Sequence, residues 1–324
     1  YRRSVCGEGQ GSGGMIQGQF ALIRRELWEH RAIYVAPLVI ALVVALFTVL
    51  GQVTVSGHEH ADKALDIGII GVTNLSEQKR AAIISGAMVS VSVPLVFTMW
   101  ILTIFYSLDC LHAERKDRSI LFWRSIPTTD FETVLSKLLT ALFVIPLITF
   151  GVIVITHLVV LLISSVWLSV RGANVWHLIW TAAPFFDNWS ATLVFILALP
   201  LWLSPFVGWF LLVSAYTKRS PFLVAFLPIA VLPLLEGILF DSSVLAEAFF
   251  VRSFRMPLFP GLDNFYSVFQ QGQHLELVEG ASLSLWSLLD LGRFMTSPDL
   301  WLGIIVCGLF TGGAIYVRRY KDDS

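Results

Sequence analysis

Six long, nearly uninterrupted apolar runs constrain the fold of this chain more than any other feature of its sequence. They cover residues 34–53, 88–108, 133–168, 191–216, 221–240 and 300–317. A helix of about 20 apolar residues spans the hydrocarbon core of a bilayer, where every backbone amide must find a hydrogen-bond partner inside the chain. The sequence therefore predicts an all-α, polytopic membrane protein with six transmembrane helices.

The composition agrees with a chain whose main partner is the lipid bilayer. Hydrophobic residues make up 56% of the 324 residues, and charged residues make up 14%. The 22 Lys and Arg residues nearly balance the 23 Asp and Glu residues, which argues against a basic surface for nucleic acid. Three cysteines, Cys6, Cys110 and Cys307, have neither disulfide-framework nor metal-ligand spacing.

Basic residues are distributed unevenly between the connections. They concentrate before the first run, after the second, after the fourth and after the sixth, as Arg24, Lys116, Lys218 and Arg318 illustrate. Short loops rich in Lys and Arg stay in the cytoplasm. We therefore expect a multi-pass protein of the inner (cytoplasmic) membrane of a bacterial cell, with both termini in the cytoplasm.

The chain divides into three parts. Residues 1–14 are polar and glycine-rich, and we expect them to be a non-native or disordered extension, which of the two being left open. In residues 15–33 apolar positions such as Phe20 recur at helical spacing among charged ones, which predicts an amphipathic interfacial helix. Residues 34–324 form the six-span transmembrane domain.

The third run, 133–168, is longer than the hydrocarbon core requires, so we expect it to tilt, protrude or break near Pro146 and Gly151. Just before it, Thr129 and Glu132 have the spacing of a capping box.

Two of the three connections expected on the outer side should carry short helices. The first holds a candidate strand at 65–72, followed by an amphipathic helix. The second, 241–298, has apolar clusters too short to span, so its helices should be re-entrant or surface-lying. The sequence leaves these two arrangements open.

The fifth run is a candidate gate. It contains Pro228 and Pro233, with Glu236 near its end, and proline frees backbone carbonyls and kinks a helix. The alternative is an ordinary kinked helix with Glu236 at the level of the lipid headgroups.

A weak metal-site candidate lies in the first outer connection. His58 and His60 flank Glu59, and imidazoles with carboxylates suit zinc or copper. Residues of these types in an exposed loop are more commonly just solvated, so we expect no metal here.

Three catalytic motifs are absent from the chain. It has no G-x-x-x-x-G-K-[ST] loop, no H-E-x-x-H and no G-x-S-x-G. These are the usual signs of an ATP-binding loop, a zinc protease and a nucleophile elbow. We therefore expect a chain that is not an enzyme, carries no cofactor and takes its energy from elsewhere.

The connection 109–132 is the most distinctive part of the chain, because a charged and then aromatic patch separates two apolar runs. Its segment 114–127 reads ERKDRSILFWRSIP. Together with the helix before the first run and the closing Arg318-Arg319-Tyr320, it resembles the ABC-2-type permease family, from about residue 15 to the end. The long segment before the sixth run departs from the family pattern.

The resemblance implies a function. In that family two six-helix subunits pair, and each docks a separate cytoplasmic ATPase through a coupling helix in such a loop. The ATPase would bind ATP and Mg²⁺, and the second permease would be a like or related chain. The residues expected to contact the ATPase are Glu114, Arg115, Lys116, Asp117 and Arg118 as orienting charges, with Phe122 and Trp123 as an apolar anchor.

The resemblance thus predicts an exporter permease that works by alternating access and moves a cargo that the sequence does not name. Other interpretations stay open at this point. The loop charges can form a solvated face, with Phe122 and Trp123 in an aromatic belt. An ion-driven secondary transporter is a second candidate, although no run has a clear midplane Asp or Glu. A membrane-embedded hydrolase is a third and weaker one.

Overall fold

The computed structural model describes residues 13–56, 58, 63, 70–116, 129–259 and 285–320, with side chains described from residue 18 onward. Every regular element in these ranges is a helix. The candidate strand at 65–72 is wrong at its described end, because residues 70–72 are helical. The remainder of that candidate, 64–69, lies outside the described residues.

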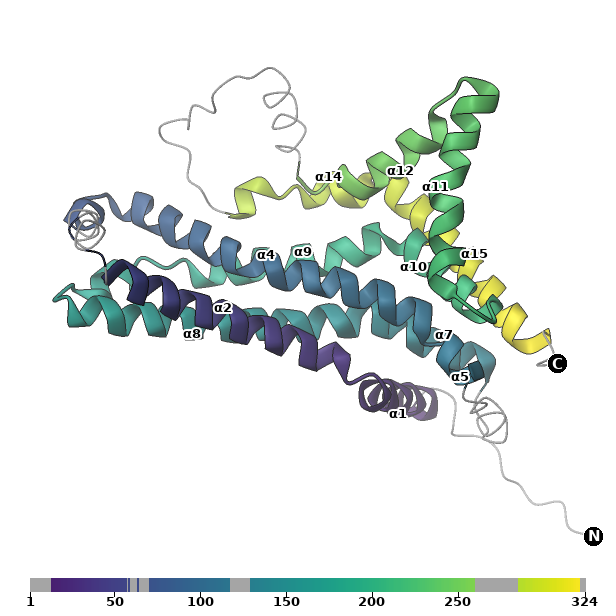
Figure 1. The fold of residues 1–324 in the computed structure, drawn as a ribbon, viewed down its shortest axis with the longest axis horizontal. Coiled ribbons are helices and arrows are strands. Elements are labelled where there is room, and N and C mark those ends of the chain that lie inside the picture. The colour runs from purple at the N-terminus through teal and green to yellow at the C-terminus, as the bar shows by residue number, and fades with distance from the viewer. Residues whose placement is uncertain are drawn as a thin grey trace, which may run out of the picture.

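Six of the described helices are long and apolar enough to cross a membrane. They are α2 (Ala32–Ser56), α4 (Glu77–Asp109), the continuous helix formed by α7 (Asp130–Leu139), η1 (Thr140–Val144) and α8 (Ile145–Val170), α9 (Phe185–Trp202), α11 (Pro221–Phe240) and α15 (Pro298–Tyr320). Figure 1 shows α2, α4 and α8 side by side along the longest axis of the molecule. The all-helical fold with six such helices is confirmed and suggests a multi-pass membrane protein.

The predicted fourth run is wrong as a single helix. The chain leaves helical geometry at Leu203, which separates α9 from the shorter α10 (Ser204–Tyr216). Pro205 is responsible, because it has no N–H for the carbonyl four residues earlier and its ring restricts the residue before it. Only α9 has the length of a span.

The third run stays helical from Asp130 to Val170 and does not break at Gly151. Instead, one π turn forms at η1, where the Ile145 N–H donates to the Thr140 carbonyl five residues back. This turn directly precedes Pro146, which cannot donate a helix hydrogen bond, and π turns absorb such an irregularity. The long helix therefore continues past Pro146 without a break.

The capping box at the start of this helix is confirmed. Thr129 Oγ1 accepts from the Glu132 N–H at 3.1 Å, and the Glu132 carboxylate accepts from the Thr129 N–H at 2.9 Å. The helix start is therefore fixed by its own first turn.

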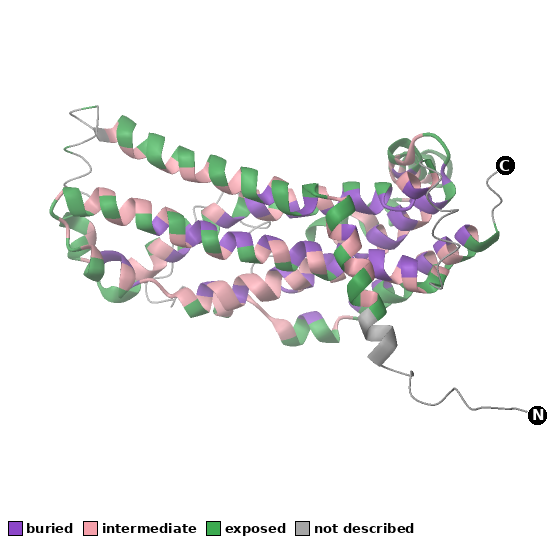
Figure 2. Ribbon diagram, turned by 90° about the horizontal axis from the view of Figure 1, so that it is seen from below, coloured by how far each residue is buried: buried purple, intermediate pink, exposed green. Residues whose placement is uncertain are grey.

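Buried residues lie along the centre of the bundle, and exposed ones lie along its outward faces (Figure 2). The main core joins α2, α4, α7, α8, α9, α10 and α15. The closest helix approach is between α10 and α15, where Gly208 contacts the backbone of Cys307.

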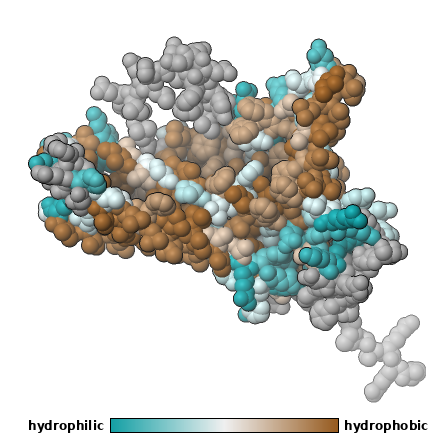
Figure 3. Space-filling view, viewed as in Figure 1, coloured by the Kyte–Doolittle hydropathy of each residue, from teal (hydrophilic) through white to brown (hydrophobic). Residues whose placement is uncertain are grey.

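Apolar side chains also cover much of the outside. Phe47 on α2 is 70% exposed and Ile238 on α11 is 79% exposed, and Figure 1 shows α11 leaving the bundle at a steep angle. Hydrophobic surface covers the body of the molecule, while hydrophilic residues gather near the end where α5 (His112–Lys116) and the C-terminus lie (Figure 3). Extended apolar surfaces of this kind need lipid or another chain to cover them.

The segment 241–298 contains only short described helices, which are α12 (Val244–Phe254), η3 (Leu285–Leu288) and α14 (Leu291–Thr296). Residues 260–284 lie outside the described part. Met256, Leu258 and Phe294 pack in a second core against Trp202 and Leu300. The described ends of this segment therefore belong to the helix bundle.

Candidate functional site

A group of buried charges lies at the hydrophilic end of the molecule, next to both described ends of the connection 109–132. We call it the ionic cluster. Its core consists of Glu26, Glu114, Lys137 and Arg318. These four residues come from α1 (Gly13–Glu29), α5, α7 and α15, so the cluster joins elements that are far apart in the sequence.

Lys137 is the centre of the cluster. Its Nζ lies 2.8 Å from Glu26 Oε1 and 3.1 Å from Glu114 Oε1. The second oxygen of Glu114 lies 2.6 Å from Arg318 Nη1. Lys137 is fully buried, and Glu26 and Glu114 are 1% and 5% exposed. Two carboxylates and two cations therefore neutralise one another away from water.

Three more side chains complete the cluster at its edges. Tyr106 on α4 donates from its hydroxyl to Glu26 Oε2 at 2.8 Å. Asp130 Oδ1 lies 2.9 Å from Arg318 Nε, and Arg25 Nη2 lies 2.8 Å from Glu114 Oε1. Burial acts to lower the pKa of Arg25, but the hydrogen bond to Glu29 and the charge of Glu114 outweigh it and raise the pKa.

Such a cluster holds its geometry strictly. A buried ion is tolerated only while its partners and hydrogen bonds are all in place, and removing one partner typically costs about 3–5 kcal/mol. Charge-assisted hydrogen bonds are also short and directional. Ion pairs and charge-assisted hydrogen bonds therefore fasten α1, α5, α7 and α15 to one another.

Helix α5 is also fastened to the end of α10. The Leu111 and His112 N–H groups donate to Ser214 Oγ at 3.2 and 3.0 Å. Arg115 donates to the Ala215 carbonyl in the last turn of α10, where a cation complements the helix dipole. The element that leads into the connection is thus anchored on two sides.

The residues predicted to contact an ATPase occupy different positions. Glu114 is buried in the ionic cluster and Arg115 is partly buried against α10, so the expectation that both are exposed rim charges is wrong. Burial follows from the tertiary contacts to Arg25, Lys137 and Arg318, which the loop sequence does not reveal. Lys116 is exposed. Asp117, Arg118, Phe122 and Trp123 lie outside the described residues.

The candidate gate is a continuous helix in the structure. Pro228 and Pro233 lie inside α11, which remains helical through both. Glu236 accepts from the N–H groups of Val244 and Leu245 at 3.1 and 2.7 Å. It thus caps the N-terminus of α12 across the turn, where a carboxylate is favoured. A gating role for these residues stays a prediction.

The described candidates for metal binding are already satisfied by other partners. His58 Nδ1 lies 2.9 Å from the Thr54 carbonyl in the last turn of α2, and His60 lies outside the described residues. Glu26, Glu29 and His30 have ligand atoms close together. However, Lys137 holds Glu26 and Arg25 holds Glu29, so their negative charge is already compensated.

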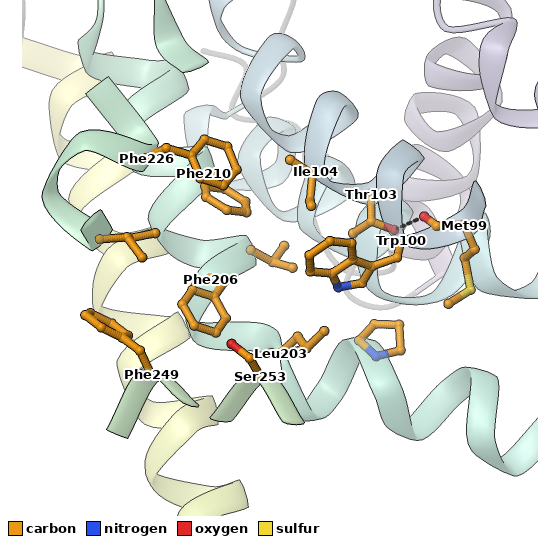
Figure 4. A pocket seen from close by; sticks show the side chains of 13 residues that line it. Met99, Trp100, Thr103, Ile104, Leu203, Phe206, Phe210, Phe226, Phe249 and Ser253 are labelled. Atoms are coloured by element: carbon orange, nitrogen blue, oxygen red, sulfur yellow. Dashed lines mark hydrogen bonds between the residues drawn. The ribbon is translucent and has the colours of Figure 1, made fainter. Parts of the chain in front are cut away.

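An apolar cavity lies beside the break between α9 and α10 (Figure 4). Its volume is about 130 Å³, and its walls come from α4, the α9–α10 break, α11 and α12. The Thr103 hydroxyl at its edge donates to the Met99 carbonyl of its own helix at 2.9 Å. The cavity therefore offers no free polar group from Thr103.

The sequence does not predict the ionic cluster, whereas His157, an ionisable residue inside the third run, predicts either a transport pathway or a hydrogen bond between helices. Lys137 inside an apolar run is the available signal, because an ionisable residue there needs a buried partner. His157 on α8 is buried and bonded to two other helices. Its Nδ1 accepts from Trp189 Nε1 at 3.3 Å, and its Nε2 donates to the Met88 carbonyl at 2.8 Å. This fully bonded neutral ring is structural.

Comparison of the chain with protein-family models, curated proteins and solved structures found no match.

Proposed function

We propose that this chain is the permease subunit of an ATP-driven exporter, with a separate ATPase docking on the connection 109–132. The observation that supports the proposal best is the ionic cluster. Through it, α5 at the start of this connection and α7 at its end are tied to each other and to α1 and α15. A force applied to the connection would therefore reach several long helices at once.

Transmission of a conformational change from the connection to the bundle needs a rigid group of helices, here called the base, and a hinge. The ionic cluster and the bonds from α5 to α10 form the base. The α9–α10 break at Leu203 and the neighbouring cavity supply the hinge, because hinges lie at the ends of elements. We infer that motion of the base opens and closes the bundle near this break.

A second permease subunit is part of the proposal. The apolar faces of α2 and α11 are largely exposed in the single chain. Either lipid or a second copy can cover them, and a two-fold pair would place a pathway at the interface. We propose a homodimer or a heterodimer with a related permease, in the inner membrane with both termini cytoplasmic.

The ion-driven secondary transporter is less well supported. Such carriers use acidic groups near the middle of their spans. In the described part of the six long helices, the acidic residues lie towards the helix ends, as Glu77, Asp187, Glu236 and Asp299 show.

The docking test uses the two aromatic residues of the connection. We expect the Phe122→Ala/Trp123→Ala chain, purified from its native membranes, to lose at least about 2 kcal/mol of affinity for its ATPase, because buried aromatic anchors dominate docking energy. The measurement is co-purification of a P-loop ATPase, followed by the ATPase activity of the complex.

The matched control for docking is Trp176→Ala, which removes an exposed aromatic residue from η2 (Trp176–Trp180), on another connection. It should leave co-purification unchanged. If the double variant retains its ATPase and transports at the wild-type rate, the proposed docking role is refuted.

The proposed orientation gives a separate prediction. Ser76 and Arg219 are both exposed, and each can be replaced by cysteine. Only Ser76→Cys should react with a membrane-impermeant thiol reagent on intact cells. Cys6, Cys110 and Cys307 must first be replaced. Labelling of Arg219→Cys from outside would contradict the six-span orientation.

A further inference from the structure

Arg252 on α12 is a half-buried cation with spare hydrogen-bonding capacity. Its guanidinium lies 4.1 Å from the ring centre of Trp202, and its Nη1 donates to the Asp299 carbonyl at 2.7 Å. Its Nε and Nη2 are buried and have no hydrogen-bond partner among the described residues. Nη2 fills the space beside Gly303 where a Cβ would lie. Unpaired donors of a buried cation are costly, so this flexible side chain gains hydrogen bonds when it turns towards an acceptor in a neighbouring cavity.

Two cavities adjoin this arginine. One has a volume of about 540 Å³ and is lined mainly by apolar residues, among them Phe206, Trp209 and Phe249. The other has a volume of about 700 Å³ and is lined by both apolar and polar residues, among the latter Arg255 and Arg293. Trp202 and Asp299 line both cavities. An apolar space and a basic space thus lie next to each other.

Figure 4 shows how the apolar side is formed. Phe206 from α10 and Phe249 from α12 lie next to each other in its wall, with ring centres 6.2 Å apart. These two residues line the larger apolar cavity as well as the smaller one. The two apolar cavities therefore share a wall of aromatic side chains.

The charge around Arg252 favours an anion. Among the described residues of the two walls there are three arginines, Arg252, Arg255 and Arg293, and one acidic residue, Asp299. Burial lowers the pKa of Arg252 to about 10, an effect that the charge of Asp299 partly offsets. The guanidinium therefore remains charged at neutral pH.

We propose that the two cavities together bind an anionic amphiphile, with its phosphate or carboxylate group on Arg252 and its hydrocarbon part between Phe206, Trp209 and Phe249. A planar guanidinium can donate two parallel hydrogen bonds to such an anion. The apolar volume falls within the range of about 300–1,000 Å³ typical of ligand sites. A free inorganic anion would leave the apolar cavity empty, and a neutral hydrocarbon would leave Arg252 unpaired.

Binding at this site does not depend on the proposed transport function. Only the interpretation of the ligand as cargo rests on that function. The binding experiment uses the chain without any ATPase. A negative result there would leave the docking proposal unaffected, and a negative docking result would leave the binding site unaffected.

The experiment measures ligands retained by the full chain, purified in a neutral detergent, by native mass spectrometry. The probes are phosphatidylglycerol, phosphatidylcholine, dodecyl phosphate and inorganic phosphate. We expect the wild-type chain to prefer phosphatidylglycerol over phosphatidylcholine, and dodecyl phosphate over inorganic phosphate, by about tenfold or more. Tighter binding of phosphatidylglycerol identifies a bilayer lipid as the ligand, and tighter binding of dodecyl phosphate identifies a single-chain molecule. Either result supports the site.

Two variants test the role of the guanidinium. Arg252→Gln removes the cation, and Gly303→Ala keeps it but places a Cβ 1.7 Å from its present Nη2 position, so the flexible side chain must move. Both should abolish the preference, whereas Arg219→Gln, an exposed arginine on another connection, should not. Gly303→Ala decides the question if Arg252→Gln does not fold.

Three results would overturn the proposal. The first is equal binding of the two lipids by the wild-type chain. The second is an unchanged preference in both variants. The third is binding of inorganic phosphate as tight as that of dodecyl phosphate, which would exclude the apolar half of the site.

Discussion

Replacing Lys137 with Met should destabilise the protein by about 3–5 kcal/mol, the largest effect we expect from a single substitution. The variant keeps a side chain of similar length but leaves the Glu26 carboxylate without its cation and Glu114 with only its arginine partners. The Tyr106 hydroxyl alone cannot compensate a buried negative charge at Glu26. The measurement is the fraction of monodisperse protein that remains in detergent after heating.

A second substitution should restore part of this loss. The double variant Lys137→Met/Glu26→Gln removes the uncompensated charge, so it should be more stable than Lys137→Met alone. Together with the single variant Glu26→Gln, this comparison forms a double-mutant cycle that measures the coupling between the two residues. Lys79→Met, at an exposed position on α4, is the control and should be neutral. Equal stability of Lys137→Met and the wild type would show that the cluster does not hold the four helices.

The substitution Gly208→Ala should have the second-largest effect, about 1–3 kcal/mol. Its Cβ would lie 2.9 Å from both Cα and the carbonyl oxygen of Cys307. Backbone atoms cannot rotate away as a side chain can, so α10 and α15 would have to separate. Glycine at such a crossing lets two helix backbones approach closely.

The matched control for Gly208→Ala is Gly308→Ala. Gly308 lies on α15, close in sequence to the contact, but a Cβ added there meets no atom within 4 Å. The control should denature at the wild-type temperature in the same heating assay. If both variants lose the same stability, the contact with Cys307 does not account for the effect of Gly208→Ala, because helix propensity by itself favours alanine over glycine.

The two predictions bear on the same part of the proposed mechanism. Arg318 connects α15 to the ionic cluster at one end, and Gly208 connects α15 to α10 nearer its middle. Because α5 is hydrogen-bonded to α10 as well, these contacts link α5, α10 and α15 to one another next to the connection 109–132. A variant that loosens these contacts without unfolding the chain should uncouple ATP hydrolysis from transport.

The sequence by itself determined the class of fold. Long apolar runs can satisfy their backbone only as helices, so the all-helical architecture and the six long helices followed from the period and length of those runs. The bounds of α11 and the capping box at Thr129 followed in the same way, because proline at a helix start and a Thr-x-x-Glu pattern act within a single turn.

Local irregularities were only partly predictable. Pro146 and Pro205 both lie in apolar runs, yet the first is absorbed by a π turn and the second separates two helices. Proline removes the same kind of hydrogen bond in both places, so the proline alone does not decide between the two outcomes. Sequence periodicity does not contain that information.

The tertiary structure alone decided which charges are buried and what they meet. Glu26 and Glu114 look like surface residues of polar segments, and they become interior residues because Lys137 and Arg318 arrive from distant parts of the chain. The same applies to Arg252, whose partners Trp202 and Asp299 come from two other helices. A side chain's burial and partners depend on long-range packing, and this packing places both the ionic cluster and the proposed amphiphile site.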